Sequence, residues 1–169
     1  MKENYAFCLK QILRYEGGKV DNPQDPGGRT AYGITQATYN AWLTKHGLAL
    51  KDVFTISQYE VESIYKSNYW DKIRGDDLPS GLDLATFDYA VNSGVSRAAK
   101  SLQAIVGTDQ DGIIGDKTIA AAKAYVAIAL TNRRLSFLQK LSTWAVFGKG
   151  WQSRINDVKK QIEIGRAHV

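Results

Sequence analysis

Glu16 is the residue of this chain best placed to do chemistry, because it closes a segment whose apolar residues recur at helical spacing. At about 100° per residue it projects onto the middle of the apolar face of that segment. Burying a bare carboxylate there costs several kcal/mol, and the negative end of a helix dipole disfavours a further negative charge. Both effects favour the protonated carboxyl, which is the form that a general acid uses to cleave a glycosidic bond.

Gly17 and Gly18 follow the acid directly and fit two roles. Either glycine can take the left-handed conformation that ends a helix, and the bare backbone would let a bulky polymer approach the acid. The alternative interpretation is a helix-ending glutamate that turns out to solvent before a Gly-Gly cap. Helix geometry alone leaves both interpretations open.

The elements that must position Glu16 are almost all helical by their periodicity. Thr35 is expected to cap one helix, and Ser57 with Glu60 forms a capping box at the start of another. Strand signal is limited to RTAYGIT at 29–35. We therefore predict an all-α, mainly helical fold with at most a small β element near residues 20–35. The helices are expected over residues 3–16, 35–47, 57–65, 80–94, 98–106 and 117–130, around 135–141, and around 155–162.

Composition narrows the class of protein. The chain has 169 residues, is 44% hydrophobic and 23% charged, and carries a formal net charge of +5, which suits one globular domain or two small lobes. The positive charge fits a polyanionic partner or simple solubility. Cys8 is the one cysteine and the histidines number two, so neither a disulfide nor a zinc site is expected, and no cofactor motif is present.

Several stretches resemble, in collinear order, the glycoside hydrolase family 108 lysozymes, which are N-acetylmuramidases of phage endolysins, prophages and bacterial secretion systems. The opening signature is YEGGKVDNPQDPGGRTAYGIT at 15–35. Four further stretches follow it: IYKSNYWDKIRGDDLPSGLDLATFDYAVNSG at 64–94, LQAIVGTDQDGIIGDKTIAA at 102–121, RLSFLQKL at 134–141 and FGKGWQSRI at 147–155. One departure is Asp116, which stands where proline is frequent.

The resemblance implies a lysozyme-like fold with Glu16 as the catalytic acid and no cofactor or metal. It divides the chain into a catalytic lobe at 1–80 and a helical, predicted peptidoglycan-binding region at 81–169 packed on it as one compact unit. The implied reaction hydrolyses the β-1,4 bond between N-acetylmuramic acid and N-acetylglucosamine, so the partner is the peptidoglycan glycan strand.

Cleavage also needs a group that activates water or opposes the positive charge developing on the sugar. Another group of phage lysozymes pairs a glutamate with an aspartate nine positions on and a threonine soon after, a pattern that Glu16, Asp25 and Thr30 approach. Asp25 is the preferred second group and Asp21 the alternative. A third possibility is that neither acid reacts and Thr30 or a backbone group positions the water. Asp25-Pro26-Gly27 is also an ordinary turn sequence.

Substrate-binding candidates are aromatic or amide side chains. Tyr32 follows the loop directly, and Tyr69 and Trp70 are further candidates for stacking on a sugar ring. Asn92 and Asp88 lie one helical turn apart, and either they line a sugar groove, Asn92 being the better candidate, or they are a buried polar pair that fixes helix packing.

Other aromatic and basic residues are expected to have structural roles. Trp42, Trp144 and Trp151 are predicted to lie in the core. The pair Arg133 and Arg134 is predicted to be a solvated face.

The implied role is that of a monomeric phage or prophage endolysin, without membrane insertion and without nucleic acid as a partner. No signal peptide is evident at the start, so synthesis in the host cytoplasm and release by a holin to the periplasmic wall are expected. A lytic transglycosylase, a non-catalytic wall-binding or secretion-accessory protein and, more distantly, a nucleic-acid binder are the competing hypotheses.

Overall fold

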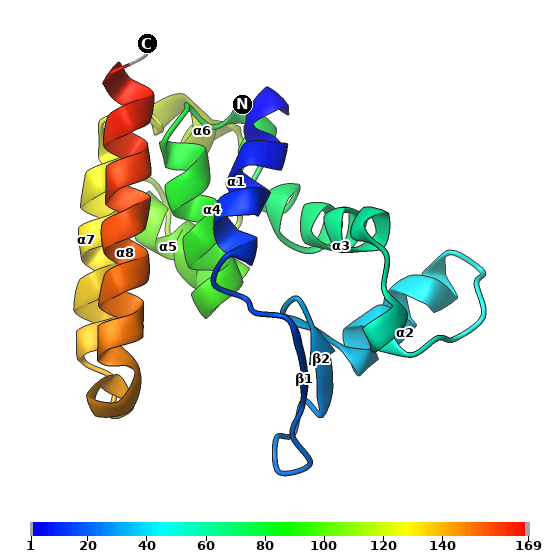
Figure 1. Cartoon of the computed structure of the whole chain (residues 1–169). Coiled ribbons are helices and arrows are strands. Elements are labelled where there is room, and N and C mark those ends of the chain that lie inside the picture. The colour runs from blue at the N-terminus through cyan, green and yellow to red at the C-terminus, as the bar shows by residue number, and fades with distance from the viewer. Residues whose placement is uncertain (1, 168–169) are drawn as a thin grey trace. The chain divides into compact units, whose positions relative to one another are not determined.

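The computed structural model describes residues 2–167 and contains mainly helices with one small sheet, which confirms the predicted fold class (Figure 1). None of the helices in this range combines the length and the apolar character needed to cross a bilayer. In chain order the elements are η1 (Lys2–Asn4), α1 (Tyr5–Leu13), β1 (Lys19–Asp21), β2 (Arg29–Ala31), β3 (Ile34–Thr35), α2 (Gln36–Lys45), η2 (Val53–Thr55), α3 (Gln58–Tyr65), η3 (Lys66–Trp70), η4 (Gly75–Asp77), α4 (Leu82–Ser93), α5 (Val95–Val106), α6 (Asp116–Ala121), α7 (Val126–Gln139) and α8 (Trp144–Ala167).

Two compact units divide the chain. The first, here called the sheet unit, comprises Leu9–Asn68 and carries all three strands. The second, here called the helical unit, comprises Met1–Cys8 together with Tyr69–Val169.

The sheet unit is organised by an antiparallel sheet in the order β1-β2-β3. Thr30 lies opposite Val20 on one side and Thr35 on the other, while Ala31 pairs with Ile34 and is fully buried. The predicted caps are confirmed: Thr35 accepts a hydrogen bond from the Thr38 backbone N–H, and the capping box of α3 is complete. These caps fix the residues at which α2 and α3 begin.

The helical unit is built around α4, in which every residue from Leu82 to Ala90 is buried. Helices α5, α7 and α8 pack against α4, and α7 and α8 run side by side in opposite directions (Figure 1). Such a helix, buried on all sides, can hold a charged residue only if that residue is paired.

Asp83 and Asp88 are both buried there, each with an exposed fraction of 1%, and two arginines from different helices pair with Asp88. The Arg134 guanidinium on α7 donates to one carboxylate oxygen, and Arg154 Nε on α8 donates to the other at 2.8 Å. Burial alone would raise the pKa of Asp88, yet the two positive charges and their hydrogen bonds outweigh it and hold that pKa below its ordinary value. The buried-packing alternative for Asp88 is thus confirmed, and the prediction that Arg134 is solvated is wrong.

Several predicted helix boundaries differ from the structure, and the separate helix expected around 135–141 is the end of α7. The first helix ends at Leu13 and not at Glu16, since a tight turn closes with the Tyr15 N–H donating to the Ile12 carbonyl at 2.9 Å. The helix predicted over 117–130 is two helices, α6 and α7, because the chain is extended at the buried Ala122 and tertiary packing overrides alanine propensity. The last helix begins early, at Trp144.

Candidate active site

The turn between β2 and β3 forms one wall of the candidate site. Its two central residues, Tyr32 and Gly33, both have positive φ, at 53° and 78°, which defines the type I′ turn of a tight hairpin. A tyrosine in this conformation is strained, and the hydroxyl of Tyr65 offsets the strain by donating to the Tyr32 carbonyl at 2.7 Å. Tyr65 is 2% exposed at the end of α3, so its hydrogen bond anchors the turn to a buried residue of the core.

The carboxylate of Glu16 lies against this same turn. A β-carbon on Gly33 would lie 2.9 Å from Glu16 Oε2 and 2.7 Å from the Tyr65 hydroxyl oxygen. These separations are too short for real carbon–oxygen contacts, so only glycine leaves room for both groups. Glu16 is half-buried and lies three residues past the end of α1, with its carboxylate against the turn.

The backbone after Glu16 is open, as the bare-backbone interpretation of the two glycines requires. A β-carbon on Gly17 or on Gly18 would meet nothing within 4 Å, and Gly17 has φ +69°. One side of the acid is thus fixed by the hairpin turn, and the chain beside it presents free space.

Asp25 occupies the tip of the β1–β2 loop and shapes a turn there. Its Oδ1 accepts a hydrogen bond from the Gly27 N–H at 2.9 Å, and its carbonyl accepts from the Gly28 N–H at 2.9 Å. Its Oδ2 makes no hydrogen bond within residues 2–167, and the side chain is exposed. Asp25 therefore stabilises the turn through Oδ1, and its Oδ2 remains available to contact a ligand or water.

Asp21 and Thr30 lie on the strands of the same hairpin. Asp21 is ion-paired with Arg29 at 3.0 Å, and Arg29 also pairs with Asp52 at 2.7 Å and stacks on the Phe54 ring. Thr30, half-buried, faces its cross-strand neighbours in the middle of β2. All five sequence-predicted residues Glu16, Asp21, Asp25, Thr30 and Tyr32 belong to the sheet unit. Glu16 and Tyr32 meet at the β2–β3 turn, whereas Asp25 lies in the β1–β2 loop, at the opposite end of β2.

Tyr69 and Asn92 belong to the helical unit and are both half-buried. Asn92 accepts a hydrogen bond from the neighbouring Ser93 hydroxyl at 3.2 Å. Trp70 is fully buried against Phe87 and Tyr5, with its indole N–H donating to Asp76, so the prediction that it offers a face to sugars is wrong.

Sequence reasoning missed Tyr65 and Gly33 as positioning residues. The Tyr-Gly pair between two short β-prone runs is a hairpin signal that could have identified the turn. Nothing in the local pattern points to Tyr65, because its contact with the turn spans 33 positions in the sequence.

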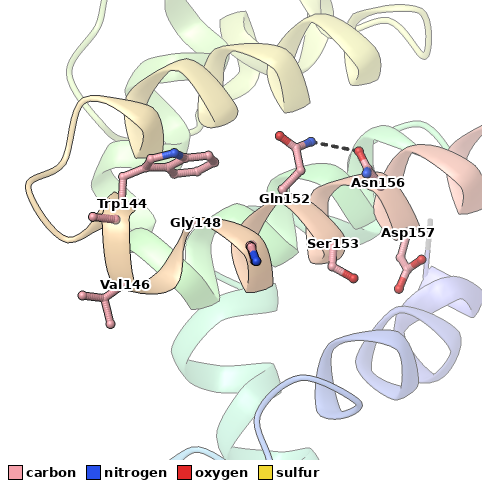
Figure 2. Close-up of a pocket in the computed structure, with 9 residues that line it drawn as sticks. Trp144, Val146, Gly148, Gln152, Ser153, Asn156 and Asp157 are labelled. Atoms are coloured by element: carbon pink, nitrogen blue, oxygen red, sulfur yellow. Dashed lines mark hydrogen bonds between the residues drawn. The ribbon is translucent and has the colours of Figure 1, made fainter.

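A second concave surface lies along the first half of α8, within the helical unit. This groove has a volume of about 980 Å³, and Figure 2 shows Trp144 at its start and Gln152 and Asn156 on successive turns, joined by a 3.0 Å hydrogen bond. The Trp144 ring lies close over Gly148, whose absent side chain makes room for it. Trp144 is half-buried and not fully in the core, and an aromatic face beside amide and hydroxyl groups is suited to binding sugars.

Within residues 2–167, no three His, Cys, Asp or Glu side chains gather closely enough to hold a metal ion. Cys8 is buried at 1% exposure, and burial raises the pKa of its thiol well above the ordinary value.

Comparisons with known proteins match the segment that contains the hairpin and Glu16 to a family of known proteins. The model of the family described as glycosyl hydrolase 108 matches residues 9–94. The solved structure of Brucella abortus SagA is similar over 98% of this chain and 97% of its own, with 43% sequence identity and a TM-score of 0.81. A search of curated protein sequences found no match. The chain belongs to the glycosyl hydrolase 108 family and is a glycoside hydrolase.

Proposed function

We propose that this glycoside hydrolase is an N-acetylmuramidase that hydrolyses the β-1,4 bond between N-acetylmuramic acid and N-acetylglucosamine in peptidoglycan, with Glu16 as general acid. The observation that carries the proposal is the carboxylate of Glu16, lodged against the Tyr32–Gly33 turn beside open backbone at Gly17 and Gly18. An acid fixed on one side and accessible on the other can protonate the leaving oxygen of a bound polymer.

The second catalytic group is proposed to be Asp25. Its exposed position and its uncommitted Oδ2 support it over Asp21, whose carboxylate is engaged by Arg29. In this proposal Asp25 activates water or opposes the positive charge on the sugar, and Thr30 orients the water. Tyr32 on the turn offers its ring to a sugar, with Tyr69 and Asn92 as proposed contacts from the helical unit.

Glu16→Gln in a zymogram tests the assignment, because glutamine keeps the size of the side chain and cannot donate the proton. We expect activity on peptidoglycan to fall by roughly 10²- to 10⁴-fold. Glu163→Gln is the matched control, since Glu163 is exposed on α8 and its replacement should leave activity unchanged. Full lysis by Glu16→Gln would refute the role of this acid.

Product analysis by mass spectrometry separates the competing reactions. Reducing N-acetylmuramic acid ends support hydrolysis, whereas anhydro ends would identify a lytic transglycosylase. Pelleting with sacculi without any loss of turbidity would instead identify a wall-binding protein without catalytic activity.

We further propose that the helical unit binds glycan along the Trp144 groove, supported by its aromatic and amide lining. Trp144→Ala should then weaken pelleting with purified glycan strands. The proposed biological role is that of a phage or prophage endolysin acting as a monomer. Co-expression with and without a holin tests that role, since lysis is expected only when the holin is present.

A further inference from the structure

A second cavity of the helical unit, here called the cationic cavity, has a volume of about 420 Å³. It opens at the junction of α4 and α5, and its lining comes from α5, α7 and the loop after α5. The size lies within the range of ligand-binding pockets. Its basic side chains are Arg97 and Lys100 on α5 and Arg133 on α7.

The charge of this cavity is unbalanced. No carboxylate is among its lining residues, and within residues 2–167 none of its three basic side chains has an acidic partner. Asp109 and Asp111 flank the lining residue Gln110 in the loop, and neither lines the cavity. Asp111 accepts hydrogen bonds from the Gln103 amide at 2.8 Å and from the Ile113 N–H at 2.9 Å. The first N–H groups of α5 have no side-chain cap, which adds positive potential at the same end.

Packing holds the walls of the cationic cavity in place. The Arg97 guanidinium stacks over the Phe137 ring at 4.2 Å. Ser101 on the cavity floor is 8% exposed, and its hydroxyl lies 3.1 Å from that of Tyr89. These contacts preorganise the cavity before any ligand enters.

Buried Gln103 fixes the loop that forms the remaining wall. Its amide donates to the Ile113 carbonyl at 2.9 Å and accepts from the Gly112 N–H at 3.0 Å. A β-carbon on Gly112 would lie 2.6 Å from the Ser96 hydroxyl, so this loop abuts the start of α5 closely. The loop that forms this wall is therefore held against the start of α5.

We propose that the cationic cavity binds the carboxylates of the peptide stem of peptidoglycan. Naming the stem as the ligand rests on the proposed function, because the sugar backbone of that substrate is uncharged and its acidic groups lie on the peptides. Arg97 and Lys100, three residues apart on one helix, and Arg133 on the next helix present separate cations to a chain with several carboxylates. The cavity would thus let the helical unit recognise peptide-bearing glycan.

Pelleting assays test this proposal with the Glu16→Gln protein, which leaves the wall uncleaved. Lys100→Gln with Arg133→Gln removes two cavity charges without disturbing the stacked Arg97. Lys117→Gln with Lys123→Gln is the matched control, with the same change in net charge at exposed positions that do not line the cavity. Each protein is mixed with intact sacculi, with sacculi freed of phosphate polymers by hydrofluoric acid, and with glycan strands freed of peptide by an amidase.

We expect the cavity variant to bind intact and phosphate-free sacculi roughly 2- to 30-fold more weakly than the control, as for the loss of two exposed ion pairs. On peptide-free strands the two variants should bind equally. Equal weakening of both variants on intact sacculi would overturn the proposal, as would a cavity effect that disappears after phosphate removal. Lysis by Glu16→Gln would refute the proposed acid alone, and the ratio between the variants is then measured before turbidity falls.

Discussion

Replacing Gly33 by alanine tests whether the hairpin turn sets the position of the Glu16 carboxylate. The new β-carbon meets the Tyr65 hydroxyl at 2.7 Å and Glu16 Oε2 at 2.9 Å. Tyr65 is buried and hydrogen-bonded to the Tyr32 carbonyl, whereas the carboxylate is the end of a flexible side chain. We therefore expect the carboxylate to move and Tyr65 to stay.

Two effects set how much unfolding free energy the Gly33→Ala variant loses. Holding alanine at φ +78° costs about 1–2 kcal/mol, because its β-carbon crowds the backbone in the left-handed region. Overpacking against the two oxygens adds about 1–3 kcal/mol to the loss of unfolding free energy. A carboxylate displaced by about 1 Å loses on the order of 100-fold in rate.

Gly47→Ala is the control that measures the effect of alanine at positive φ alone. Gly47 has φ +66°, follows α2 in the same unit, and a β-carbon there would meet nothing within 4 Å. Urea unfolding and turbidity loss on sacculi are measured for both variants. If Gly33→Ala lost no more stability than Gly47→Ala and kept lytic activity within about twofold, the proposed positioning of Glu16 by the turn would be refuted.

Three further predictions concern single side chains. Asp88→Asn should lower the unfolding free energy by about 3–5 kcal/mol, since it leaves two arginines buried without a counter-charge, and the exposed Asp109→Asn should change it little. Because the pKa of Asp88 is lowered in the fold, its contribution is present above about pH 4 and lost as the pH falls further, so acid unfolding of Asp88→Asn should show a shallower pH dependence. Asp25→Asn keeps the side-chain oxygen that accepts the hydrogen bond of the turn and removes only the negative charge. A loss of lytic rate above about 100-fold would support a catalytic role for Asp25, and an unchanged rate would show that Asp25 only stabilises the turn. Cys8 should resist a thiol reagent in the native protein and react at the rate of unfolding; rapid labelling would contradict its burial.

Local signals predicted much of the fold because their causes are local. Thr35 at the start of α2 and Ser57 with Glu60 at the start of α3 act over three residues, so their hydrogen bonds can be predicted from the sequence. The same holds for Gly107, whose φ of +78° ends α5 as expected.

Features that depend on distant partners could not be predicted. The alternatives for Asp88 stayed open because its partners are 46 and 66 positions away. Glu16 lies past the end of α1 and against the Tyr32–Gly33 turn, and helical periodicity cannot include a contact with so distant a segment. The split of 117–130 has the same origin, since burial of Ala122 outweighs the helix preference of an alanine-rich segment.

The Asp88 ion pairs also limit how the chain can be cut or recombined. The segment matched by the family model ends at residue 94, yet the counter-charges of Asp88 are on α7 and α8. A chain truncated at residue 94 would keep the buried acid and lose both arginines, so it should fail to form a stable α4. A chimera made from two relatives should therefore fold only when α4, α7 and α8 come from the same parent. The segment that the family model matches and these two helices thus have to change together in evolution.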